Sequence, residues 1–547
     1  MNNQMFCFQC QETAGGKGCI SSSVCGKSPE VAALQDLLVY ETKALSCITT
    51  QLRKEKQSVD SKTNHLIKLN LFTTITNTNF NPVAIRKKIN KTLLDKKNLL
   101  SEIKDTSSFS EKILWDYEST SLEGKALDVG VLSVEDEDIR SLKEIITYGL
   151  KGLAAYTIHA NALRKEDEGI DAFMQYALAK TLDNSLSVDD LVTLALQTGR
   201  YGISGMALLD RANTNRYGSP EKTEVNIGTR NNPGILISGH DLHDLEMLLE
   251  QTKGRGVDVY THSEMLPAHY YPMFKIYPHF VGNYGNAWWR QKEEFEKFNG
   301  PILMTTNCLV PPAESYMSRL WTTGAVGFPG CQHIKDRDGK GKDFSSIIAQ
   351  AKLCPPPEKI ETGKVTGGFA HEYLDKFSDA IVKAVNSKKI RRFLVMAGCD
   401  GRMKAREYYT EFAKRLPNDV IILTAGCAKY RFNKLDLGEI DGIPRILDVG
   451  QCNDSYSLIL TVLQLKDLLK TENINDLPIV YSLSWYEQKA VLVLLSLLHL
   501  GIKRIYLGPT LPAFFSSNVK DLLVKTFDIQ KIGEVDSDLE ALFGSLS

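Results

Sequence analysis

The sequence of 547 residues lacks several features that would assign it to a common class of protein. There is no G-x-G-x-x-G loop after a first strand and no Walker loop, so the usual dinucleotide and nucleoside triphosphate sites are excluded. The longest apolar run, residues 490–502, is too short to cross a bilayer and is interrupted by Ser496, His499 and Gly501. We expect a buried helix there and no association with a membrane.

An excess of charge is also missing. Lys and Arg together number 65 and Asp and Glu 66, so no global field attracts nucleic acid. The first ten residues, MNNQMFCFQC, lack the basic and apolar regions of a signal peptide, and we expect a cytoplasmic protein. In that compartment the eleven cysteines are expected to bind metal or serve catalysis rather than form a disulfide framework.

Four cysteines lie close together near the N-terminus in the pattern C-x2-C-x8-C-x5-C. Glycines between them let the backbone fold tightly around sulfur. Four thiolates suit either zinc or an iron–sulfur cluster. The spacing favours iron–sulfur, because a zinc ribbon usually pairs two C-x2-C knuckles and only one is present. The four residues are Cys7, Cys10, Cys19 and Cys25.

The chain divides by pattern into a helical part and two α/β parts. Apolar residues recur at helical spacing in residues 29–54, 142–163 and 189–209. Beyond residue 222, strand-like and helix-like segments alternate, as in doubly wound folds with mainly parallel sheets. We predict three domains, with a helical bundle carrying the cysteine loop first and two Rossmann-like domains after it: residues 1–217, 218–360 and 361–547.

Seven apolar stretches, each typical of a buried parallel strand, end in a metal-ligand type. In open α/β sheets, ligands bind outside the carboxyl ends of the strands. The residues at these strand ends are therefore expected to point toward one shared site. The seven residues are His240, Glu264, Cys308, Cys399, Cys427, Cys452 and Glu487.

Each of the seven also has an ordinary interpretation. A single strand-end cysteine is usually a small buried hydrophobe, and Glu264 or Glu487 could simply cap the next helix. It is the coincidence of all seven that favours a large redox metal cluster. Thiolates suit iron bound to sulfide, whereas imidazole and carboxylate suit iron exposed to oxygen ligands or substrate. The mixed set predicts a cluster with unequal irons at which a small molecule is reduced.

Several segments resemble the hybrid-cluster proteins, also called hydroxylamine reductases. They are FCFQCQETAGGKGC, SGHDLHDLEMLLEQT, THSEMLPAHYYP, TTNCLVPP, GFPGCQH, AGCDGR, TAGCAKYRFN, DVGQCNDSYS and LSWYEQKAV. The resemblance runs from the first residues to near the C-terminus. It implies a helical N-terminal domain followed by two α/β domains, in agreement with the periodicity.

The resemblance also implies two cofactors. The four N-terminal cysteines would hold a [4Fe–4S] cluster, and the seven strand-end residues would hold a hybrid [4Fe-2O-2S] cluster. The family's cysteine at the position of Cys399 carries a persulfide. At a position near the second strand end where the family has glycine, this chain has Ser263, a small change that should be tolerated.

The activity implied is reduction of hydroxylamine to ammonia and water. Glu487 and Lys489 are candidate proton donors by position. Electrons would come from a separate ferredoxin-like protein or NADH-dependent reductase. Other possibilities are nitric oxide reduction or nitrosyl transfer to protein thiols in defence against nitrosative stress. A non-enzymatic electron carrier or redox sensor would leave Glu264 and Glu487 without a role.

Overall fold

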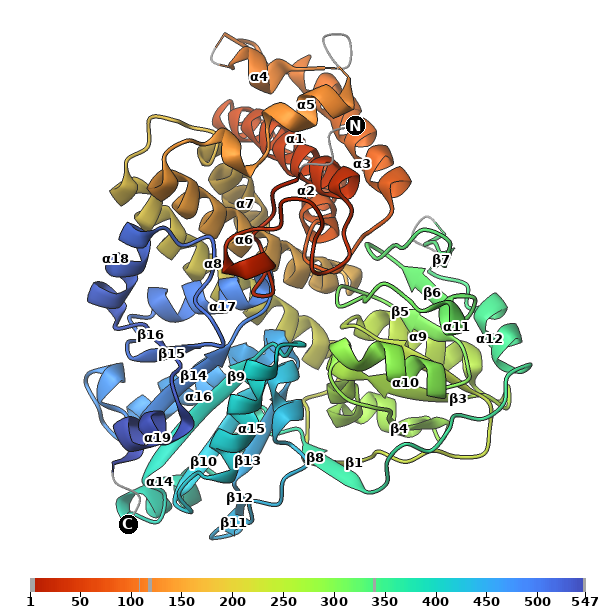
Figure 1. The fold of residues 1–547 in the computed structure, drawn as a ribbon, viewed down its shortest axis with the longest axis vertical. Helices are drawn as coiled ribbons and strands as arrows, with labels where there is room; N and C mark the ends of the chain where they lie inside the picture. The colour runs from red at the N-terminus through yellow and green to blue at the C-terminus, as the bar shows by residue number, and fades with distance from the viewer. Residues whose placement is uncertain (1–4, 108, 117–120, 338–340, 545–547) are drawn as a thin grey trace.

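The computed structural model describes residues 5–107, 109–116, 121–337 and 341–544. A group of long helices forms one end of the molecule, and two six-stranded sheets lie side by side below it (Figure 1). This arrangement confirms the predicted fold class. Within the described residues, no helix has the length and apolar character needed to cross a membrane.

The helical part is built from well-capped helices. The Ser28 side chain accepts a hydrogen bond from the backbone of Val31 at the start of α1, and Pro follows the caps of α1 and α3, as is favoured at first helical positions. Helices α1, α6 and α8 match the three segments with helical periodicity. The elements are α1 (Pro29–Lys54), α2 (Ser61–Thr73), α3 (Pro82–Leu100), α4 (Glu111–Leu114), α5 (Leu122–Asp128), α6 (Glu137–Ala162), α7 (Glu168–Lys180) and α8 (Val188–Tyr217).

The first sheet has the strand order β4-β3-β2-β5-β6-β7, and every neighbouring pair is parallel. The chain starts in the middle at β2, runs outward to β4 and then restarts on the other side at β5. The topological switch point therefore lies between β2 and β5. The strands are β2 (Gly234–Ser238), β3 (Asp258–His262), β4 (Phe280–Asn283), β5 (Ile302–Met304), β6 (Leu320–Thr323) and β7 (Gln332–Ile334).

The second sheet repeats this topology with the order β13-β10-β9-β14-β15-β16, again parallel throughout. Its switch point lies between β9 and β14. The strands are β9 (Arg392–Gly398), β10 (Val420–Ala425), β13 (Ile446–Gly450), β14 (Ile479–Ser484), β15 (Ile505–Gly508) and β16 (Gln530–Lys531).

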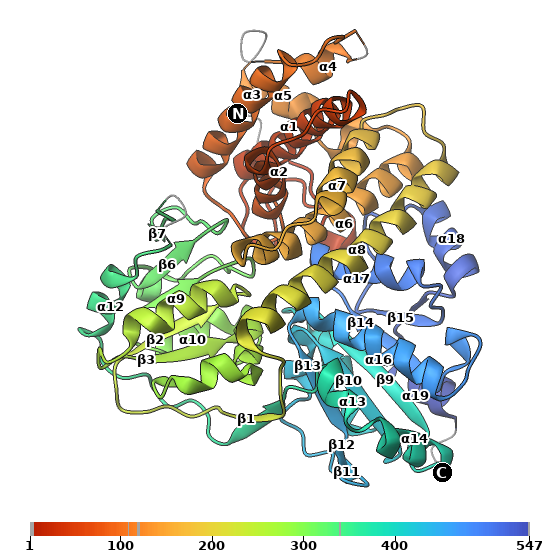
Figure 2. The same cartoon turned by 180° about the vertical axis from the view of Figure 1, so that it is seen from behind.

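A two-stranded antiparallel ribbon crosses between the two sheets. It pairs β1 (Thr223–Asn226) with β8 (Lys364–Gly367) and is visible at the lower edge of both views (Figures 1 and 2). The predicted domain boundaries at residues 217 and 360 stay predictions.

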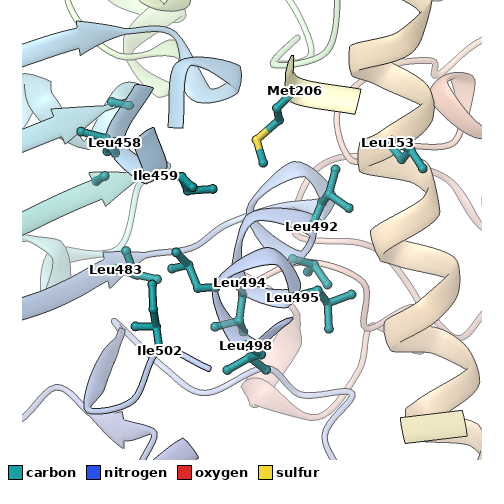
Figure 3. Packing of buried hydrophobic residues seen from close by; sticks show 14 of the residues in the cluster. Leu153, Met206, Leu458, Ile459, Leu483, Leu492, Leu494, Leu495, Leu498 and Ile502 are labelled. Carbon is teal, nitrogen blue, oxygen red and sulfur yellow. The ribbon is translucent and has the colours of Figure 1, made fainter. Parts of the chain in front are cut away.

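One helix, α17 (Gln488–His499), leaves the second sheet and packs into the helical part (Figure 3). Glycines of α6 and α8 let it approach closely: a Cβ atom on Gly199 would lie 2.0 Å from the carbonyl oxygen of Leu495. A Cβ atom on Gly152 would lie 2.9 Å from the carbonyl oxygen of Gln488. The start of α17 is therefore held against the helical part by backbone contact.

Candidate functional site

The N-terminal cysteines share one folded loop, which we call the four-cysteine site (Cys7, Cys10, Cys19 and Cys25). Cys7 and Cys19 pair through two backbone hydrogen bonds, of 3.1 and 2.8 Å. Gly15 and Gly16 adopt positive φ between them. Burial raises the pKa of Cys10 well above its ordinary value, and the neighbouring charges of Cys25 and Cys7 raise it further. The loop thus concentrates sulfur at one place.

This loop also contacts the residue next to Glu487. The backbone N–H of Gln11 donates to the carbonyl oxygen of Tyr486 at 2.9 Å. The side-chain amide of Gln488 donates to the carbonyl oxygen of Gln9 at 2.7 Å. The segments that carry the two predicted sites are therefore hydrogen-bonded to each other.

The seven strand-end residues of the sequence analysis, which we call the seven-residue site, all lie beyond the carboxyl ends of parallel strands. His240 and Cys308 follow β2 and β5, the strands that flank the switch point of the first sheet. Cys399 and Glu487 follow β9 and β14, which flank the switch point of the second. The remaining three follow adjacent strands, namely β3, β10 and β13 for Glu264, Cys427 and Cys452.

Tight backbone turns bring these side chains inward. Gly239 and Gly398 have φ of 109° and 112°, and a Cβ atom on Gly398 would lie 2.1 Å from the carbonyl oxygen of Ser484. Larger residues would not fit there. Cys308 has φ of 83°, a conformation that a non-glycine residue rarely adopts.

Ser263 has a backbone conformation that is unusual for a residue with a side chain. It has φ of 55°, a conformation that favours glycine, and its hydroxyl oxygen lies 3.3 Å from the sulfur of Cys427. The hydroxyl therefore adds a polar contact to one of the seven residues.

Three of the seven offer ligand atoms that lie within 4.8 Å of one another: His240, Glu264 and Cys452. Nε2 of His240 is 3.7 Å from Oε2 of Glu264, and the backbone N–H of Cys452 donates to the same Oε2 at 2.8 Å. Oε1 of Glu264 is buried and, within the described residues, has no hydrogen-bond partner. A nitrogen, an oxygen and a sulfur ligand therefore converge around an unsatisfied carboxylate oxygen.

Burial shifts the titration of these groups strongly. It raises the pKa of the Cys308 and Cys427 thiols well above the ordinary range, and it raises that of Cys399 to about 12, with the Glu487 charge adding to the effect. Burial also lowers the pKa of His240 well below its usual value, so the imidazole is neutral. Buried thiols, a carboxylate and a neutral imidazole form a donor set that bound metal would stabilise, because metal binds thiolate and lone-pair nitrogen. The residues present fit a mixed iron–sulfur–oxygen cluster.

Lys489 lies at the centre of this donor set. Its Nζ is 2.9 Å from Nε2 of His240 and 3.6 Å from Oε1 of Glu487. An ammonium group can only donate, so Nε2 accepts and the proton of the imidazole is on Nδ1, which lies 2.7 Å from the hydroxyl oxygen of Thr306. Nε2 is thus the nitrogen that faces the site.

Burial alone would lower the pKa of Lys489, but the charges of Cys452 and Glu487, with those of other site residues, outweigh it and raise the pKa above its usual value. Lys489 therefore carries a proton within the site. Glu487 also caps α17, accepting from the backbone of Lys489 at 2.8 Å, which confirms the ordinary interpretation of this residue as a helix cap.

Sequence reasoning missed three polar residues of the site. The Asn307 amide accepts from Lys489 at 2.9 Å and points its N–H group at Cys308, 3.6 Å from the sulfur. Gln451 donates to the carbonyl oxygen of Glu264 at 2.7 Å. Tyr156 comes from α6: burial raises its pKa well above the ordinary value and the neighbouring Cys452 adds to this. Asn307 and Gln451 directly precede ligand-type residues, a signal that could have drawn attention to them.

Comparison with known proteins identifies the family. The Prismane/CO dehydrogenase family matches residues 5–540. The chain is 60% identical to the hydroxylamine reductase of Desulfovibrio desulfuricans over 545 residues, which cover all of both chains. It is 58% identical to the hydroxylamine reductase of Clostridium perfringens, over 99% of this chain and 100% of that protein.

A solved structure shares the fold. Carbon monoxide dehydrogenase IV from Carboxydothermus hydrogenoformans superimposes with a TM-score of 0.56 at 16% identity, over 95% of this chain and 88% of the other. At that identity the match describes the fold alone. The extent of the sequence match decides the relationship: this chain belongs to the Prismane/CO dehydrogenase family.

Proposed function

We propose that this chain is a hydroxylamine reductase, which reduces hydroxylamine to ammonia and water. The observation that carries the proposal is the gathering of four thiols, two carboxylates and one imidazole where the two switch points meet. Relatives matched over their full length are named hydroxylamine reductases, which supports the same reaction. An electron carrier would need only the four-cysteine site and would leave Glu264 and Glu487 without a role.

Proteins of the family carry a [4Fe–4S] cluster and a hybrid cluster. We propose that the four-cysteine site holds the first and the seven-residue site the second. When bound, the hybrid cluster would supply electrons and a coordination position open to substrate on its oxygen-ligand side. We place that side at His240, Glu264 and Glu487, whose nitrogen and oxygen atoms are harder ligands than thiolate.

The chain's own residues would handle protons. Breaking the N–O bond of hydroxylamine consumes two electrons and two protons and releases ammonia and water. Lys489 holds a proton at Nζ, and Asn307 fixes that nitrogen at 2.9 Å. We propose Lys489 as a general acid and Glu487, when it is not bound to iron, as a second proton donor; its Oε1 lies 3.6 Å from Nζ of Lys489.

Electrons would enter at the four-cysteine site from a separate ferredoxin-like protein or NADH-dependent reductase. The loop supports this entry point, because Gly15, Gly16 and Lys17 are exposed while Cys7 and Cys25 are half-buried. A docked donor could approach the sulfurs there. We propose the cytoplasm as the location.

The first test is metal content. Iron and acid-labile sulfide should be measured on anaerobically purified protein, on Cys399→Ala and on Cys354→Ala, a control whose half-buried thiol contacts the carbonyl oxygen of Gln350. Two clusters' worth of iron is expected in the wild type and the control, and one cluster's worth in Cys399→Ala. Equal iron in all three proteins, at one cluster's worth, would contradict a hybrid cluster in the seven-residue site.

Activity is tested separately with reduced viologen and hydroxylamine. We expect substrate-dependent oxidation of the viologen, which a mere electron carrier would not show. In Glu487→Ala this turnover should disappear while the spectrum of the N-terminal cluster remains. Full activity in that variant would remove Glu487 from the proposed site.

A further inference from the structure

A buried lysine lies directly against the four-cysteine site. Lys27 is only 7% exposed, although lysine is rarely buried without a partner. Its Nζ donates to the sulfur of Cys7 at 3.4 Å and to Oε1 of Gln35 at 3.0 Å. The Gln35 amide in turn donates to the carbonyl oxygen of Asn79 at 3.0 Å. Gln35 is thereby oriented so that its oxygen faces the lysine, and Lys27 is held against sulfur.

The other side of Lys27 borders a cavity of about 100 Å³ beneath the cysteine loop. Four lysines and two carboxylates line it, so positive charge is in excess: Lys27, Lys43, Lys143, Lys151, Asp36 and Glu144. Lys151 donates to the side chain of Gln9 and Lys143 to that of Asn184. Across the described part of the chain, Lys27 is the one lysine of this cavity that donates to a cysteine sulfur.

A charge in this position has a large effect on electron uptake. Four thiolates make the site negative, and each arriving electron makes it more so. A nearby cation that is shielded from water favours the reduced state, because the interaction is weakly screened. Reduction potentials of iron–sulfur sites depend on net charge and on hydrogen bonds to the sulfurs, and Lys27 provides both.

We propose that Lys27 sets the reduction potential of the four-cysteine site, by stabilising it after an electron arrives from the external redox protein. Lys27 is a positioning and charge-compensating residue and does not touch substrate. This inference rests on the proposed function, because it requires that Cys7, Cys10, Cys19 and Cys25 hold a redox cluster.

The test is a potentiometric titration of the intact enzyme followed by electron paramagnetic resonance. The signal of the N-terminal cluster is first identified as the one lost in Cys10→Ala. Its midpoint potential is then compared in wild type, Lys27→Met, Lys27→Arg and Lys43→Met. The last variant removes a lysine from the same cavity without touching a cysteine sulfur. Iron is counted in every protein.

We expect a lower midpoint potential in Lys27→Met, a value near wild type in Lys27→Arg and a smaller fall in Lys43→Met. An unchanged potential in Lys27→Met with full iron would overturn the proposal. If Lys27→Met loses iron, Lys27→Gln replaces it, and loss of iron there too would assign Lys27 to cluster assembly instead. Absence from the wild type of a signal that depends on Cys10 would refute the proposed function itself, which is a distinct result.

Discussion

The Nζ atom of Lys489 lies 2.9 Å from Nε2 of His240, which places a buried ammonium group beside the nitrogen that would bind metal. This contact makes Lys489 the best-placed proton source in the seven-residue site. The side chain of Lys489 is 3% exposed. Bulk water therefore cannot act as the proton donor in its place unless the structure changes.

We expect Lys489→Met to lower kcat for hydroxylamine by about 100-fold, the usual size of a general-acid effect. Met keeps the unbranched apolar stem of the lysine side chain and removes only the ammonium group, so iron content should stay at the wild-type level. Steady-state kinetics with reduced viologen measure the loss, and Lys503→Met, at an exposed position between α17 and β15, serves as the control. Wild-type kcat in Lys489→Met would show that protons arrive by another route.

The glycine contact between α6 and α17 leads to a second prediction. A Cβ atom on Gly152 would lie 2.9 Å from the carbonyl oxygen of Gln488 and 3.1 Å from Cα of Lys489. Gly152→Ala should therefore push the start of α17 away and lower hydroxylamine turnover, although alanine favours a helix over glycine by about 1 kcal/mol.

Kinetics, iron content and thermal unfolding of Gly152→Ala should be compared with those of Gly169→Ala. Gly169 lies in the first turn of α7, and the added carbon would lie 3.2 Å from a side-chain oxygen of Asp167, the residue that caps this helix. We expect normal activity there. Equal activity in both variants would mean that α17 can shift without disturbing Lys489.

Breaking a buried ion pair in the helical part should lower the free energy of unfolding more than breaking an exposed one. Lys96 donates to Glu41 at 2.6 Å, with side chains 3% and 0% exposed. Lys96→Met leaves a buried carboxylate unpaired and should cost about 3–5 kcal/mol. Lys364→Met, which breaks an exposed pair with Glu224, should lower the free energy of unfolding far less, because water screens that pair. Urea unfolding followed by circular dichroism compares the two, and similar midpoints would refute the distinction.

The pH dependence of stability should report His269, which stacks on Phe280 at 3.8 Å. Burial lowers the pKa of His269 to about 3, so the folded state resists a proton that the unfolded state accepts below about pH 6.5. The free energy of unfolding therefore decreases as the pH falls below about 6.5, and His269 accounts for a loss of about 2 kcal/mol at pH 5.

The measurement is urea unfolding at pH 7 and pH 5 for wild type and His269→Gln. Gln cannot be protonated, so the variant should lose less stability over this interval. Parallel losses in the two proteins would show that other groups account for the acid sensitivity.

Seven strands and the residues that follow them were predicted from the sequence, because both depend on local pattern; β4, β6, β7 and β16 were not predicted. A short apolar run bounded by a turn is buried wherever it lies, and parallel strands necessarily present their carboxyl ends together. The same reasoning predicted α1 over its full length, since its helical periodicity is a local signal.

Contacts between distant residues could not be predicted in this way. Tyr156 reaches the seven-residue site only because α6 packs on α17, and Lys27 lies on Cys7 only because the loop folds back. Helix α2 was also missed: its sequence, SKTNHLIKLNLFT, is polar, and it buries Lys68 against Asp171 and Asn70 against Thr92. The residues that pair with Lys68 and Asn70 come from other helices, so the sequence of α2 alone does not identify them.

The shared topology of the two sheets has a consequence for how the protein matures. Three of the seven proposed ligands follow strands of the first sheet and four follow strands of the second. Neither sheet alone therefore supplies all seven proposed ligands. Iron would be retained at the seven-residue site only after the two α/β parts have docked. Stable metal binding would therefore require completed tertiary structure.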